Sequence, residues 1–139
     1  MRILKCQTCR NVWLYTGDLE ASCICSRCRT TVRIQIREVP IRWTDPVPTG
    51  CPGDPVLPGN TAVPFIDVYD RTLTLAFQVA SEDGTHVRTL LLPARVLEDL
   101  GVPAQALTDA VLAAGGNTVR SGRYPVGPTL CALLQPAFD

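Results

Sequence analysis

Two closely spaced pairs of cysteines near the start of this chain of 139 residues constrain its fold more than any other feature. Cys6 and Cys9 form the first pair, and Cys25 and Cys28 form the second; two residues stand between the cysteines of each pair, and the fifteen residues 10–24 separate the pairs. This spacing lets both sulfur atoms of a tight turn point at one cation about 2.3 Å away, and two such turns complete a tetrahedron. The pattern therefore predicts a four-cysteine Zn²⁺ site.

The spacing leaves three alternatives to this zinc site open. A rubredoxin-like iron or an iron–sulfur centre uses similar spacing, and disulfides would also join nearby cysteines. Cys23 stands two residues before Cys25 and offers another ligand, because both side chains share one face of an extended strand. We favour Cys25, since Cys25 and Cys28 repeat the spacing of the first pair. Of the remaining cysteines, we expect Cys51 to be a free thiol and Cys131 to be a small buried side chain.

A metal held by four protein ligands has no open position for water or substrate, so we expect it to be structural. About 40 residues cannot bury enough apolar surface to fold alone. Removal of the metal is therefore expected to unfold this part of the chain.

Candidates for catalysis elsewhere are weak. His86, the only histidine, follows a predicted turn, and Asp67 and Asp70 have the pattern of turn residues. Gly115-Gly116 lacks the Lys and Ser/Thr of a phosphate-binding loop. No acid, base and nucleophile are placed together by the sequence, which predicts that the protein is not an enzyme and has no small-molecule substrate.

Prolines divide the chain into three parts. Seven prolines and three glycines lie between residues 40 and 64, where they disfavour regular structure. We therefore expect a β-rich zinc ribbon over residues 1–40, a Pro/Gly-rich linker over 41–63 and a small α+β domain over 64–139. Trp43, near the start of the linker, is expected to pack on one of the flanking domains.

The periodicity of apolar residues predicts the secondary structure of these parts. In the ribbon, Val32, Ile34 and Ile36 alternate with polar residues, which is typical of a half-buried strand. The α+β domain is predicted to hold a hairpin and two short helices. Its elements are a strand over 73–79, a turn at Glu82-Asp83-Gly84, a strand over 87–92, helices over 94–100 and 104–114, and a final strand over 129–134.

The net charge of zero hides an uneven distribution. Residues 1–44 carry eight basic and three acidic side chains, a net charge of +5, whereas residues 45–139 carry five basic and ten acidic ones, a net charge of −5. A zinc ion with four thiolates adds −2, which leaves the first part at about +3. A moderately basic module is thus attached to an acidic one.

The chain contains no run of about 18 apolar residues and no apolar stretch before Cys6. This pattern predicts that the chain has neither a membrane span nor a secretory signal. We therefore expect a cytoplasmic location. Thiols stay reduced there, which favours metal binding over disulfides.

Two stretches carry a resemblance to a known family. They are Ile3-Leu4-Lys5-Cys6-Gln7-Thr8-Cys9 and Cys25-Ser26-Arg27-Cys28-Arg29, the second followed by a β-rich segment. Over residues 3–36, about a quarter of the chain, they resemble the Com-type zinc-finger translational regulators of Mu-like bacteriophages. Cys23 and residues 40–139 have no counterpart in that family.

The resemblance implies a phage-encoded protein located in the host cytoplasm or the virion. It also implies a metal role for the four paired cysteines and contact with RNA through a basic zinc-bound module. The residues implied for that contact are Arg10, Arg27, Arg29 and Arg33.

Two functions of different classes fit these observations. The first is a nucleic-acid-binding regulator whose arginines contact the phosphates of RNA or DNA. Trp13 or Tyr15 would stack on an unpaired base in that case, although we favour a place for both in the small core of the ribbon. The second is a structural or adaptor component of a larger protein assembly, such as a phage virion, in which the proline-rich segment lies along a partner. We prefer an interaction module whose ribbon touches nucleic acid or a nucleic-acid machine.

Overall fold

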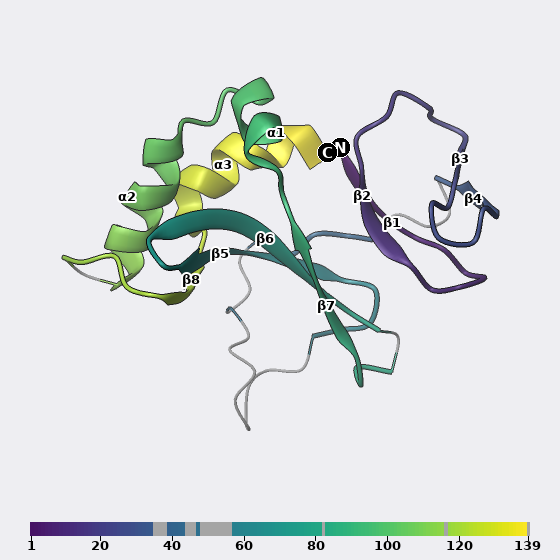
Figure 1. Cartoon of the computed structure of the whole chain (residues 1–139), viewed down its shortest axis with the longest axis horizontal. Helices are drawn as coiled ribbons and strands as arrows, with labels where there is room; N and C mark the ends of the chain where they lie inside the picture. The colour runs from purple at the N-terminus through teal and green to yellow at the C-terminus, as the bar shows by residue number, and fades with distance from the viewer. Residues whose placement is uncertain (35–38, 44–46, 48–56, 82, 116, 139) are drawn as a thin grey trace. The chain divides into compact units, whose positions relative to one another are not determined.

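The computed structural model describes residues 1–34, 39–43, 47, 57–81, 83–115 and 117–138 (Figure 1). These residues form small β-sheets and a few short helices, in two compact units, Met1–Pro40 and Ile41–Asp139, called unit 1 and unit 2 below. Four sequence-based interpretations involve residues outside the described ones: Ile36, Cys51, Glu82 and Gly116. The same holds for most of the predicted linker.

Unit 1 consists of two antiparallel hairpins. Their strands are β1 (Arg2–Lys5), β2 (Val12–Tyr15), β3 (Ser22–Ile24) and β4 (Thr31–Arg33), with β1 paired to β2 and β3 paired to β4. After β4, the backbone N–H of Val39 donates to the carbonyl oxygen of Ile3 (2.9 Å), which ties the end of the unit to its first strand. Three of the six residues in one buried core cluster of unit 1 are cysteines; its members are Leu4, Cys6, Cys23, Cys25, Val32 and Ile34. Trp13 and Tyr15 pack against this core, as favoured from the sequence.

Unit 2 is built on a four-stranded antiparallel sheet in the order β7-β6-β5-β8. The strands are β5 (Ala62–Tyr69), β6 (Thr72–Ala80), β7 (Val87–Leu91) and β8 (Gly122–Pro125). The predicted hairpin is present, since β6 pairs with β7 and Phe77 lies opposite Leu90. Its turn contains Gly84 with a φ of 73°, a conformation that glycine adopts at little cost.

β5 was not predicted, because Pro64 was assigned to the end of the linker and Asp67 to a turn. Both residues lie within this central strand. The N–H of Arg42 donates to the carbonyl oxygen of Ala62 (2.9 Å) at the edge of β5 that faces away from β6. Backbone groups alternate along a strand, so those of Pro64 point to this same edge, on which β8 pairs. β8 begins to pair only at Phe65. The missing N–H of Pro64 therefore falls in a gap of the hydrogen-bond ladder, where proline is tolerated.

β5 and β6 are joined by a two-residue turn, because Tyr69 lies opposite Thr72. The turn residues Asp70 and Arg71 have φ angles of 47° and 64°. Positive φ at both central residues is the type I′ geometry that matches the twist of a hairpin. The turn contains no glycine, so the usual sequence signal for it is missing.

The described residues of unit 2 include three helices, one more than predicted. They are α1 (Ala94–Asp99), α2 (Ala104–Gly115) and α3 (Gly127–Phe138). The first two confirm the predicted helices. The strand predicted over residues 129–134 is wrong: this segment lies in α3, where Leu130 and Leu134 are buried one turn apart. Figure 1 shows α2 and α3 side by side, and α2 also contacts β6 and β8.

An aromatic cluster ties the beginning and end of unit 2 together. The ring centroid of Trp43 lies 6.3 Å from that of Phe77 on β6 and 5.7 Å from that of Phe138 on α3. The centroids of Phe77 and Phe138 are 5.2 Å apart. Trp43, at the start of the predicted linker, therefore belongs to the core of unit 2. None of the described helices has the length and apolar character needed to cross a membrane.

Candidate metal centre

Each Cys-x-x-Cys pair forms a turn of the same kind, called a knuckle below. The N–H of Cys6 donates to the carbonyl oxygen of Asn11 (2.8 Å), and the N–H of Cys25 donates to that of Thr30 (2.9 Å). In both cases the bond joins the first cysteine to the fifth residue after it. The chain reverses at the residue after the second cysteine: Arg10 has a φ of 61° and Arg29 a φ of 62°. The two knuckles thus share one local structure. From the sequence, only the repeated spacing of their cysteines was recognised.

The knuckles bring the four predicted sulfur atoms together. The sulfur atoms of Cys6, Cys9, Cys25 and Cys28 all lie within 4.8 Å of one another. Cys6 Sγ is 3.6 Å from Cys28 Sγ, and Cys9 Sγ is 3.6 Å from Cys25 Sγ. A tetrahedron of sulfur atoms about 2.3 Å from a central ion has edges of about 3.8 Å, whereas a disulfide bond measures about 2.05 Å. The group has the dimensions of a metal site and not those of two disulfides.

The pKa values of three of these thiols are shifted to different extents by nearby hydrogen bonds, by burial and by the neighbouring sulfur atoms. The backbone N–H groups of Cys28 and Arg27 lower the pKa of Cys25 to about 6, and the hydroxyl of Thr30, 3.1 Å from Cys28 Sγ, lowers the pKa of Cys28. The N–H of Asn11 lowers the pKa of Cys9, but burial and the neighbouring sulfur atoms together raise it to about 11. Four thiolates this close together repel one another, so a cation is needed to hold them all in the ionised form.

Cys23 lies beside this group but is not one of its four members. It is on β3 opposite Val32, buried in the core of unit 1. Burial, followed by the charge of Cys25, raises the pKa of Cys23. The structure thus brings together the set with Cys25 rather than the alternative set with Cys23.

Two further residues of the site were not identified from the sequence. Asn11 is 6 % exposed, and its Nδ2 lies 3.8 Å from Cys25 Sγ of the other knuckle. Thr30 contacts Cys28 as described. Each stands two positions after the second cysteine of its pair, so the repeated pattern Cys-x-x-Cys-Arg-polar was the signal that could have identified them.

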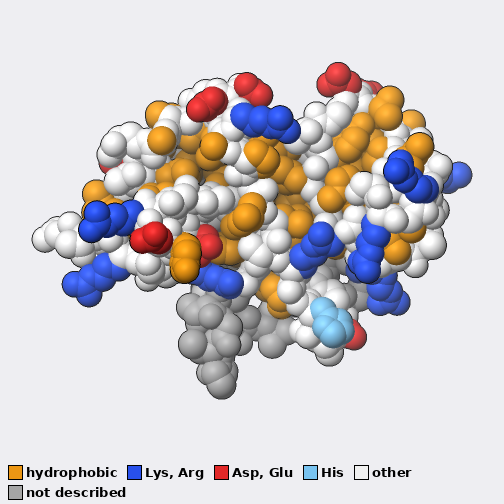
Figure 2. All heavy atoms as spheres, viewed as in Figure 1, with side chains coloured by type: hydrophobic (Ala, Val, Ile, Leu, Met, Phe, Trp, Pro, Cys, Tyr) orange, Lys and Arg blue, Asp and Glu red, His pale blue; other side chains and the backbone are white. Residues whose placement is uncertain are grey.

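The four arginines implied by the resemblance all lie on the surface of unit 1. Arg10 and Arg29 follow the second cysteine of each knuckle, Arg27 lies inside the second knuckle, and Arg33 is the last residue of β4. Basic side chains are visible in Figure 2 over the region that β1–β4 occupy in Figure 1. Their exposure leaves these guanidinium groups accessible to a ligand.

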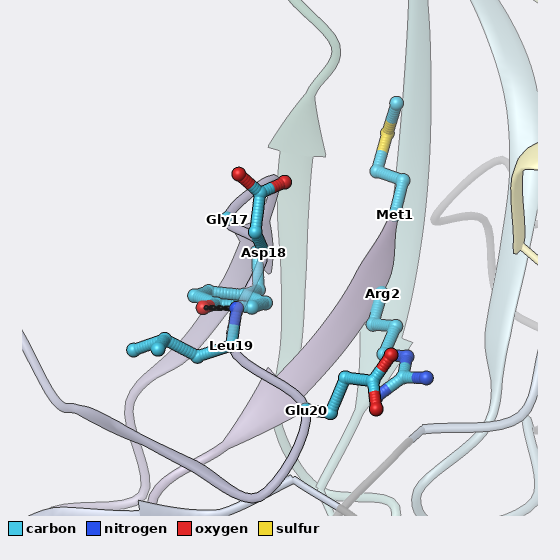
Figure 3. Close-up of a pocket in the computed structure, with 7 residues that line it drawn as sticks. Met1, Arg2, Gly17, Asp18, Leu19 and Glu20 are labelled. Carbon is cyan, nitrogen blue, oxygen red and sulfur yellow. Dashed lines mark hydrogen bonds between the residues drawn. The ribbon is translucent and has the colours of Figure 1, made fainter.

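Unit 1 also has a hollow of about 370 Å³ away from the sulfur atoms (Figure 3). It lies between the start of β1 and the loop after β2, where the N–H of Leu19 donates to Tyr15 Oη (3.0 Å). A Cβ atom at Gly17 would lie 2.5 Å from that hydroxyl oxygen, so a larger residue there would require the Tyr15 ring to shift. The carboxylate of Glu20 lies beside the side chain of Arg2 in Figure 3, so the lining is polar and carries both charges.

The weak catalytic candidates do not converge in unit 2. Asp70 is in the turn before β6, whereas the exposed His86 pairs with Ser81 beyond the other end of β6. At about 3.3 Å per residue, the strand holds them roughly 30 Å apart. Asp67 is half-buried within β5.

No protein-family model, no curated protein and no solved structure matches this chain.

Proposed function

We propose that residues 1–40 form a zinc ribbon with a structural ion, and that this ribbon contacts nucleic acid, or a nucleic-acid machine, as a regulator. The observation that carries the proposal is the group of four sulfur atoms within 4.8 Å of one another. Like the family it resembles, the chain would then be phage-encoded, and it would not be an enzyme.

The size of the group supports a single ion. A polynuclear iron–sulfur cluster inserts further iron and sulfide between the cysteines, so it needs a wider cage than edges of 3.6 Å allow. A single tetrahedral S₄ site suits Zn²⁺ or a rubredoxin-like iron. Metal analysis of the purified protein distinguishes the two, because the iron site absorbs visible light and the zinc site is colourless. One zinc per chain supports the proposal, and a stoichiometric iron would overturn it.

A structural role for the ion follows from its four protein ligands, which leave no position for water or substrate. Cys6 and Cys25 are fully buried, so the ion would be enclosed on that side by the core itself. The ion would therefore replace part of a hydrophobic core in a unit of about 40 residues.

The charge of unit 1 supports contact with nucleic acid. Arg10, Arg27, Arg29 and Arg33 are exposed, and unit 1, with seven basic and three acidic side chains, keeps about +2 after the charge of a zinc–thiolate centre is counted. Guanidinium groups bind phosphates in a planar, two-pronged geometry. If all four contact the phosphates of a single strand, the slope of log K against log salt is expected to be about −3.

The test measures binding of the zinc-loaded chain to labelled single-stranded RNA and duplex DNA over a range of salt concentrations. Replacing Arg27 and Arg29 by Ala is expected to reduce the RNA slope from about −3 to about −1.4. The matched control replaces Arg95 and Arg120, two exposed arginines of unit 2, and is expected to leave the slope unchanged. Absence of binding at low salt would overturn the regulator and leave a ribbon that serves contacts with protein, the adaptor function.

A further inference from the structure

β7 is an edge strand of the four-stranded sheet, and its outer side faces no other strand of the described residues. The N–H of Leu92 donates to the carbonyl oxygen of Leu75 (2.8 Å), and the N–H of Ser81 donates to that of His86 (2.7 Å). Backbone groups alternate along a strand, so residues 86, 88, 90 and 92 face β6 and residues 87, 89 and 91 face outward. Within the described part of the chain, the N–H and C=O groups of these three outward residues make no hydrogen bond.

Two of these three residues carry exposed apolar surface on one face of the sheet. Val87 and Leu91 are 53 % and 59 % exposed, although both are large aliphatic residues. They lie opposite Ala80 and Ala76, on the face that points away from Phe77 and hence away from α3. Between them, Thr89 lies opposite Gln78, which is 6 % exposed and whose Oε1 has no hydrogen-bond partner.

Among the described residues, β7 also lacks the features that protect an edge strand from pairing. Proline, lysine, bulges or a covering helix usually block such an edge. The other edge strand of the sheet, β8, has only four residues, ends at Pro125 and contacts α2. β7 has five residues without proline or glycine, and its single charge, Arg88, lies on the Phe77 face.

We propose that β7 pairs antiparallel with β7 of a second copy of this chain, about a two-fold axis at Thr89. Val87 and Leu91 are equally distant from Thr89, so each Val87 would lie opposite the partner's Leu91, apolar against apolar. The outward residues would meet outward residues throughout, which forms about six hydrogen bonds. This inference is independent of whether the ribbon binds nucleic acid.

Charge selects the antiparallel arrangement. It places Arg88 opposite the partner's Leu90, whereas parallel pairing in register would place the two Arg88 side chains next to each other. Like charges directly opposite one another destabilise a sheet. The metal-loaded chain carries a net charge of only about −2, so two copies repel each other weakly at long range.

The area of contact sets the strength of this dimer. A strand of five residues is about 17 Å long and a sheet is about 10 Å thick, so the edge buries on the order of 200 Å² per copy. Stable dimers bury about 800 Å² per partner. The dimer is therefore weak and reversible, and it forms at high protein concentration.

Sedimentation velocity of the metal-loaded full chain, from about 10 μM to about 1 mM, tests the proposal. The wild type is expected to shift from monomer toward dimer across this range. The double variant V87K/L91K places like charges opposite each other and is expected to remain monomeric. V87E/L91K is expected to restore the dimer, because each introduced glutamate at position 87 faces the introduced lysine at position 91 of the partner. The matched control is Tyr69→Lys, which changes a residue 78 % exposed at another hairpin and is expected to dimerise like the wild type.

Circular dichroism verifies that each variant is folded. We expect all of them to fold, because the side chains of Val87, Leu91 and Tyr69 are exposed. A wild type that stays monomeric at the highest concentration would overturn the proposal. So would equal association of wild type and V87K/L91K. Failure of V87E/L91K to associate, beside an associating wild type, would overturn the antiparallel register centred on Thr89.

Discussion

Replacing Arg10 and Arg29 by glycine is expected to tighten metal binding. Both arginines have a left-handed backbone, with φ angles of 61° and 62°. This conformation costs an L-residue about 1–2 kcal/mol and costs glycine little. Glycine loses about 0.5–1 kcal/mol more conformational entropy on folding, so the net gain is about 1 kcal/mol at each site.

The gain is expected in the metal affinity itself, because folding of unit 1 and binding of the proposed ion would be one process. One substitution should tighten the affinity about fivefold, and R10G/R29G together, at about 2 kcal/mol, about thirtyfold. Competition with a chromophoric chelator at fixed pH measures these ratios.

Arg27→Gly is the matched control. It removes the same charge from the same knuckle as R29G, but Arg27 has no positive φ. Glycine there brings only the entropic cost, so the metal affinity is expected to fall by about two- to fivefold. If R29G binds metal no more tightly than R27G, the arginines are not held in a conformation that favours glycine, and the reasoning fails.

Removal of the ion by a chelator is expected to unfold unit 1 and leave unit 2 folded, because cysteines are three of the six residues in the buried cluster of unit 1 at the site, whereas unit 2 packs around its own apolar sheet. Amide hydrogen exchange checks this, and protection in unit 1 that survives chelation would contradict it. Cys25→Ser is expected to abolish stoichiometric metal binding, whereas Cys23→Ser keeps it, as native mass spectrometry can measure; equal loss in both variants would make Cys23 a ligand. Ser81 and Thr85 donate to Asp83 and hold its pKa below the ordinary 3.8. The ionised form is thus favoured by the fold, so its contribution to stability is present above pH 3.8 and is lost as the pH falls through the lowered pKa. In an NMR titration, S81A should move this pKa back toward 3.8, and an unchanged pKa would refute the assignment.

The elements that could be predicted are those with a local signal. The cysteine spacing identified the four sulfur atoms that come together, since a turn of fixed length leaves them few other arrangements. The hairpin of β6 and β7 follows from Asp83-Gly84 between two apolar stretches, and α2 follows from helical spacing of Leu107 and Val111.

The elements that could not be predicted depend on their surroundings. Pro64 is acceptable in a central strand only because β8 begins to pair one residue later. The short apolar segment around Cys131 has no periodicity that separates a strand from a helix, and packing of Leu130 and Leu134 decides for the helix. Arginine after each second cysteine gave no sign of a left-handed turn, because glycine is the usual residue there.

The cysteine-rich core of unit 1 has a consequence for how long the intact chain persists in a cell. Stabilisation by a bound ion grows by about 1.4 kcal/mol for each tenfold rise in its free concentration, and only unit 1 receives it. Proteases cleave the transiently opened form, whose population rises as the ion becomes scarce. We therefore expect metal shortage to trim the chain to its second unit rather than to degrade it as a whole, so that the ratio of trimmed to intact protein records the supply of metal.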